Sequence, residues 1–148
     1  MPRQIISPGA PFDIPVDDLS GLPQTEREAA LVRLASDEAQ KPFNLARPPL
    51  MRARLVRLSA TEHAFLVTTH HIISDNWSGQ VLIRELAALY DATARGLPSP
   101  LPPLTLQYAD FAAWQRQWLE GTTEADGRTP LQRQIDYWMD KLAGAAPL

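Results

Sequence analysis

Two adjacent histidines, and an aspartate four residues after the second, are the side chains of this sequence best suited to chemistry. They lie within TTHHIISDNWS, which runs from Thr68 to Ser78. An imidazole exchanges a proton near neutral pH because its unperturbed pKa is about 6.5. A carboxylate ahead of a helix can instead serve structure alone, by accepting the unpaired amide hydrogens of that helix. The cluster therefore indicates either acid–base chemistry or a stabilised turn.

The apolar run EHAFLVTTHHI predicts a strand over residues 62–72. Side chains alternate between the two faces of a strand, so we expect His70 and His71 to point in opposite directions. Only one of the two rings can then face a given cleft. A metal site built from both would have poor geometry, and the sequence has no further cluster of His or Cys, so we expect no metal.

A helical period begins at Trp77 and ends at Gly96. Ser74, Asp75 and Asn76 stand before it, and any of them can cap its start. The place of His71 at the carboxyl end of a strand favours chemistry, because α/β folds open their clefts at such ends.

The complete pattern predicts an α/β fold with two adjacent strands and about four helices. The remaining expected elements are an extended arm over residues 1–23 with a short strand at Gln4–Ser7, a helix capped by Thr25 with Glu28 and ended by Pro42, a strand over 50–59, a proline-rich linker over 97–104, a helix over 106–120, and a helix capped by Thr129 and ended by Gly144. The aromatic stripe of the third helix, from Tyr108 to Trp118, is expected to be core.

The composition bounds the class of protein. A net charge of -3 argues against nucleic acid as a partner, and the absence of cysteine removes disulfides and thiolate ligands. No run of 18 apolar residues and no signal-peptide pattern is present, so we expect a soluble, cytoplasmic protein with no membrane partner.

The pattern HHxxxDxWS resembles the signature of nonribosomal peptide synthetase condensation domains, which belong to the acyltransferase superfamily that includes chloramphenicol acetyltransferase. PFNLARPPLMRARLVRL before it, and LTLQYADFAAWQRQWLEG and QRQIDYWMDKLAGAAPL after it, are similar to further segments of that family. The resemblance covers essentially the whole chain. It implies a chloramphenicol acetyltransferase-like fold of two lobes, of which residues 1–148 supply part of the N-terminal lobe with an incomplete sheet.

The same resemblance implies an activity and its partners. Condensation domains form an amide bond between a donor acyl or peptidyl thioester and an acceptor aminoacyl thioester. Each substrate is carried on the 4'-phosphopantetheine arm of a carrier protein, and no cofactor binds the domain directly. His71, which matches the second histidine of the motif, would take or orient the proton of the attacking amine. The isolated segment is expected to be inactive, because the second lobe is missing.

The other motif residues are expected to support the turn. His70 is expected to be structural, and the family pairs the aspartate, here Asp75, with an arginine. Arg52 and Arg54 are the candidate partners on the neighbouring strand.

The positions after the aspartate shape the turn and the start of the helix. Asn76 stands where the family usually has glycine, and asparagine best tolerates a left-handed backbone among the other residues. Trp77 is expected to pack the turn, Ser78 to shape it, and Gly79 to allow a close approach of the backbone.

Two alternatives stay open from the sequence. The protein could be a related acyltransferase that uses coenzyme A or a carrier protein. It could also be a non-catalytic remnant that binds a carrier protein without turnover.

Overall fold

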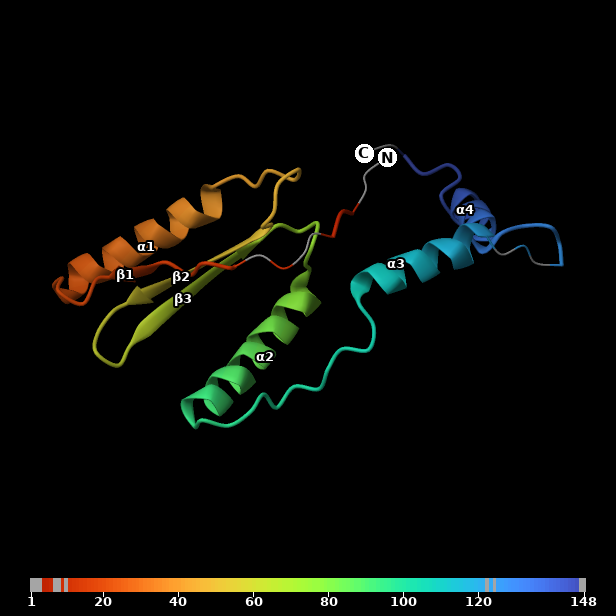
Figure 1. Ribbon diagram of the computed structural model, residues 1–148. Coiled ribbons are helices and arrows are strands. Elements are labelled where there is room, and N and C mark those ends of the chain that lie inside the picture. Colours follow the sequence, from red (N-terminus) through yellow and green to blue (C-terminus); the bar gives the residue numbers. More distant parts are fainter. Residues whose placement is uncertain (1–3, 7–8, 10, 122, 124, 147–148) are drawn as a thin grey trace. The chain divides into compact units, whose positions relative to one another are not determined.

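The structure is a computed structural model, and it describes residues 4–6, 9, 11–121, 123 and 125–146. The chain divides into two compact units, Met1–Asp91 and Ala92–Leu148. The first contains a small sheet and the histidine motif, and the second contains two of the helices (Figure 1).

The sheet of the first unit has three strands in the order β1-β2-β3. They are β1 (Val16–Asp18), β2 (Met51–Arg57) and β3 (His63–Thr69). β2 and β3 form an antiparallel hairpin that begins with Met51 opposite Thr69. β1 runs parallel to β2, with Val16 opposite Leu55. The two predicted adjacent strands are therefore present, and a third strand joins them.

Helix α1 (Gln24–Gln40) covers one face of this sheet (Figure 1). Ala30 of the helix is 8% exposed and Val56 of β2 is completely buried, so these two positions belong to a small core. Arg27 extends from the helix and donates to the main-chain oxygen of Leu58 at 2.7 Å, which ties the helix to the hairpin.

Three local predictions differ from the structure in this unit. Residues 4–6 are not a strand, and Ser7 lies outside the described residues. The strand of the predicted arm is instead β1, whose three residues are too few to show a period. The capping box predicted at Thr25 is wrong, because α1 begins at Gln24 after Pro23 and no side chain caps it.

Helix α2 (Asn76–Ala94) follows the histidine motif. The chain leaves the helix through Gly96, whose φ of +67° is a left-handed conformation that glycine adopts without a steric penalty. This confirms glycine as the stop. Residues 97–104 form neither helix nor strand.

The second unit contains α3 (Tyr108–Arg116), a π-helical turn η1 (Gln117–Gly121) that continues it, and α4 (Pro130–Lys141). Thr129 caps α4 as predicted, in a reciprocal box with Gln132. Helix α3 begins two residues later than expected, because Gln107 forms a second capping box with Asp110. The four predicted helices are thus confirmed.

The aromatic stripe of the second unit is not core in this chain. Tyr108 is 71% exposed and Trp114 is 56% exposed, and the indoles of Trp114 and Trp118 stack with centroids 6.1 Å apart. The rings contact one another along the helix, and the described residues of the unit leave them accessible. Periodicity identified an apolar face correctly, but it does not show whether the chain itself covers that face.

Candidate active site

The histidine motif begins where the hairpin ends. The last pair of the sheet is Met51 with Thr69, and the main-chain N–H of His70 then donates to the oxygen of Leu50 at 3.0 Å. The chain turns immediately afterwards, and the N–H of Ile73 donates to the oxygen of His70 at 3.0 Å. Both histidines therefore lie in a turn after β3, and the predicted strand to residue 72 is too long.

The side chain of His70 closes this turn. Its Nδ1 accepts a hydrogen bond from the N–H of Ile72 at 3.0 Å, so in this arrangement Nδ1 carries no proton. Its ring meets the ring of Phe43 edge-on, with centroids 5.9 Å apart and planes at 89°. His70 is half-buried and makes structural contacts on two sides.

His71 has a different environment. Its side chain is exposed, and its imidazole has no hydrogen-bond partner in the described part of the chain. The two rings do lie in different environments, but the predicted reason, alternation along a strand, is wrong, because neither histidine belongs to β3. The rings are instead distinguished by their contacts: His70 is tied to the turn, and His71 is accessible.

Asp75 caps helix α2. Its Oδ1 accepts from the N–H and from the hydroxyl of Ser78, both at 2.7 Å. These two bonds hold the pKa of Asp75 below its ordinary value, the hydroxyl having the larger effect, and the nearby His71 lowers it further. An ionised carboxylate four residues after His71 therefore fixes the start of the helix.

A hydroxyl of the same turn ties it back to the strand. Ser74 donates from its Oγ to Thr69 Oγ1 at 2.7 Å. Hydrogen bonds therefore hold the turn at three points: Ser74 bonds to Thr69 at the end of β3, Ile72 bonds to the His70 ring, and Asp75 caps α2.

The other motif residues lie on the first turns of α2 and differ from expectation. Asn76 has no left-handed backbone, since no non-glycine residue described has a positive φ, so this position does not require glycine here. Trp77 is 75% exposed and does not pack the turn. A Cβ atom at Gly79 would meet no heavy atom within 4 Å beyond the adjacent residues and the backbone of its own helix, so no close approach explains this glycine.

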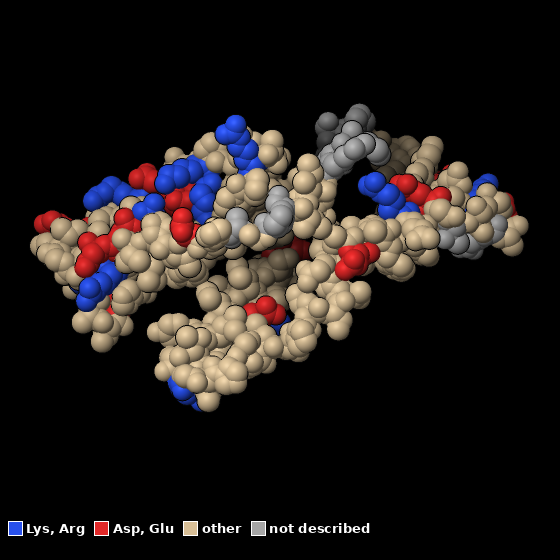
Figure 2. All heavy atoms as spheres, viewed as in Figure 1, with Lys and Arg blue, Asp and Glu red and all other residues tan. Residues whose placement is uncertain are grey.

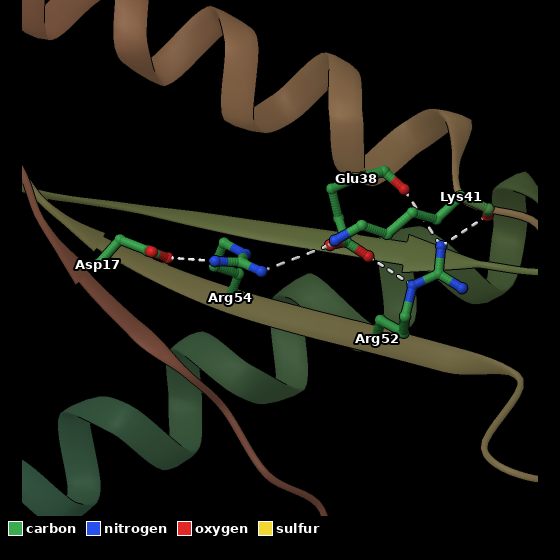
Figure 3. A network of polar contacts seen from close by, with 5 residues as sticks. All are labelled: Asp17, Glu38, Lys41, Arg52 and Arg54. Atoms are coloured by element: carbon green, nitrogen blue, oxygen red, sulfur yellow. Dashed lines mark hydrogen bonds and ion pairs between the residues drawn. The ribbon is translucent and has the colours of Figure 1, made fainter.

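Arg52 and Arg54 have partners other than Asp75. Arg52 donates from Nε to Glu38 Oε1 at 2.5 Å, and Arg54 donates from Nη1 to Asp17 Oδ2 at 2.5 Å (Figure 3). Both arginines point toward α1 and β1 instead of the histidine turn. The expected ion pair of either arginine with Asp75 is therefore absent from the described structure.

Glu38 is the centre of this network, and sequence reasoning did not single it out. It is 5% exposed, although it lies near the end of a helix where a negative charge opposes the helix dipole. The hydrogen bond from Arg52 lowers its pKa most, and Lys41 at 3.2 Å lowers it further. Figure 2 shows acidic and basic side chains interspersed over α1 and the sheet. The alternate arginines of β2 were the signal that could have predicted an acidic partner.

Two further observations concern other classes of site. Among the described residues, no group of three or more His, Cys, Asp or Glu side chains is placed to hold a metal ion. No helix in that same part of the chain is long and apolar enough to cross a membrane.

Comparison with known proteins places the chain in a family. The sequence profile described as "Condensation domain" matches residues 1–148. Malpibaldin synthetase of Mortierella alpina is 50% identical over 128 residues, which are 86% of this chain and 2% of that protein.

Solved structures agree with this match. The X-domain from teicoplanin biosynthesis is 34% identical with a TM-score of 0.77, over 96% of this chain and 29% of that one. The cyclization-docking bidomain of EpoB, a nonribosomal peptide synthetase protein from Sorangium cellulosum, is 28% identical with a TM-score of 0.73, over 97% of this chain and 26% of that one. This chain thus spans a small part of each relative's length, and it belongs to the condensation domain family.

Proposed function

We propose that this chain supplies the histidine turn of a condensation domain that forms an amide bond between two carrier-bound substrates. The observation that carries the proposal is the contrast between the two rings of the motif. His71 is exposed and unbonded, while His70 and Asp75 are bonded into the turn on either side of it. Such a turn presents one imidazole to a reactant and holds its main chain in place.

The reaction follows from ordinary acyl-transfer chemistry. The amine of the acceptor aminoacyl thioester attacks the donor carbonyl, the new C–N bond forms, and the C–S bond of the donor thioester breaks. The imidazole of His71 takes a proton from the attacking amine, and the proton passes to the thiolate that leaves on the donor's 4'-phosphopantetheine arm. A thioester is already activated, so holding the two tethered substrates in line supplies a further part of the rate.

The partners in this proposal are a donor and an acceptor carrier protein. The relatives named as synthetases support this class of partner, because a thioester substrate must be delivered to the domain. The remaining lobe of the domain would hold the acceptor against the donor.

The test is the substitution His71→Ala in the intact protein that carries this segment. Donor- and acceptor-loaded carrier proteins are mixed with it, and the dipeptidyl thioester is followed by mass spectrometry. We expect a loss of on the order of 10²–10⁴-fold, the usual contribution of an acid–base group. His63→Ala is the matched control, since His63 is an exposed histidine at the opposite end of β3. A soluble His71→Ala protein with the parental rate would remove His71 from the chemistry.

A binding role without turnover is the second candidate. The similarity to the teicoplanin X-domain supports it, because that X-domain forms a complex with OxyB. Titration of a labelled carrier protein against the intact parent and His71→Ala proteins distinguishes the two candidates. Equal binding together with histidine-dependent product supports catalysis, and binding without product from either protein supports docking.

A further inference from the structure

Phe43 contacts both a fixed arginine and the first histidine of the motif. The guanidinium carbon of Arg52 lies 3.8 Å from the centroid of the Phe43 ring, and the ring of His70 meets it edge-on at 5.9 Å. We propose that Phe43 is a positioning residue for the reaction, which holds the His70 ring and thereby the main chain that carries His71. This inference rests on the proposed function of His71.

One side of the Phe43 ring faces a rigid support. The guanidinium of Arg52 donates to Glu38 Oε1 at 2.5 Å and, from Nη2, to the main-chain oxygens of Glu38 at 3.1 Å and of Lys41 at 2.9 Å. A guanidinium that is bonded to three acceptors has little freedom to rotate. The guanidinium therefore holds a fixed cation over the face of the Phe43 ring, an arrangement that aromatic faces favour.

The other contact of Phe43 leads directly to the turn. The ring of His70 is bonded through Nδ1 to the N–H of Ile72, so the ring and the main chain on both sides of His71 form one unit. The edge of one ring against another also has a preferred geometry. A change in the tilt of the His70 ring would therefore shift the N–H of Ile72 and, with it, the backbone of His71, which lies in the chain between His70 and Ile72.

Phe43 is suited to this role because it is not part of the buried core. The buried apolar side chains of the described residues belong to other positions, and Phe43 is half-buried in the connector between α1 and β2. Its removal should therefore leave the fold intact while loosening the turn. A displacement near 1 Å at a reacting group can cost about 100-fold in rate.

The experiment compares three variants in the intact protein that carries this segment. Phe43→Leu keeps an apolar side chain and removes the ring, Phe43→Tyr keeps the ring, and Phe65→Leu is the matched control on β3. We expect Phe43→Leu to lower kcat for amide formation about 10- to 100-fold with the KM of the loaded acceptor carrier and the melting temperature little changed. We expect Phe43→Tyr and Phe65→Leu to stay within about twofold of the parent, since both keep the aromatic ring that contacts Arg52 and His70. Phe43→Met replaces Phe43→Leu if the latter is insoluble.

His71→Ala is measured in parallel, so that the two proposals fail separately. If His71→Ala loses activity and Phe43→Leu keeps the parental kcat, positioning by Phe43 is wrong and the role of His71 stands. If His71→Ala keeps the parental rate, the proposed role of His71, on which this inference rests, is wrong. A rate loss in Phe43→Leu that Phe43→Tyr shares, or that matches a loss of folded protein, would also overturn the positioning role.

Discussion

Replacing Glu38 by glutamine removes the charge at the centre of the ion-pair network and keeps the size of the side chain. The Glu38 side chain is 6% exposed, and its loss of charge leaves Arg52, at 25% exposure, and Arg54, at 20%, without a shared counter-ion. Breaking a buried pair costs about 3–5 kcal/mol. Both arginines are partly solvated and the glutamine oxygen can still accept one hydrogen bond, so we expect the free energy of unfolding to fall by about 2 kcal/mol.

The pH dependence of this loss follows from the pKa of Glu38. The hydrogen bond from Arg52, with a smaller contribution from Lys41, holds this pKa below the ordinary value of 4.5. The unfolded chain therefore takes up the proton first as the pH falls. The stabilisation is complete above about pH 4.5 and is lost as the pH falls through the folded-state pKa. Glutamine does not titrate, so the difference between parent and variant should shrink in that acidic range alone.

The measurement is urea unfolding of the condensation domain that carries this chain, followed by tryptophan fluorescence. Glu28→Gln is the control, because Glu28 lies on the same helix, is exposed, and accepts a hydrogen bond from the nearby Gln24 side chain at 3.1 Å, which a glutamine oxygen can also accept. We expect that control to stay within about 0.5 kcal/mol of the parent. A Glu38→Gln protein as stable as the control at pH 7, or a loss that is equal at pH 7 and about pH 3.5, would refute the network as a source of stability.

Two further predictions concern the helix cap and the isolated chain. Asp75→Ala should lower the melting temperature of the domain, because the hydrogen bond from the Ser78 N–H to the carboxylate, which caps α2, is lost. Asp75→Asn should keep most of that melting temperature, since an amide oxygen can also accept the bond. An Asp75→Asn protein that melts like the parent but forms no amide would indicate a direct chemical role for the carboxylate. The 148 residues alone should form no dipeptidyl thioester from loaded carrier proteins, because no second lobe holds the acceptor in line; histidine-dependent product from a monodisperse monomer, detected by mass spectrometry, would contradict this.

Features with local causes were predictable from the sequence. Thr129 ahead of Pro130 predicted the start of α4, and the structure has a reciprocal cap there. Gly144 after the same helix has a φ of +81°, which few other residues adopt. The hairpin was predictable too, because the apolar runs of β2 and β3 are separated by a short polar turn.

Features with distant causes were not predictable. β1 pairs with a strand far along the chain, and Arg54 bonds to Asp17 across 37 positions. Neither partner carries a local signal, because three residues show no period and a lone aspartate has many uses. Glu38 gave a conflicting signal, since the helix dipole disfavours an acid near the end of a helix and only the arginines of β2 explain it.

The position of the neighbouring strand β2, and not the alternation of side chains, determines where β3 ends and the histidine turn begins. The apolar run of β3 continues to Ile72, but β2 begins at Met51, directly after Pro49 and Leu50, so pairing stops opposite Thr69. The last main-chain N–H of this strand that bonds to the segment beside it is that of His70, which donates to the main-chain oxygen of Leu50. Beyond that point the backbone must satisfy its own groups, and it does so by turning. The exposure of His71 is therefore a consequence of where β2 begins, together with the contacts that hold the residues on either side of it.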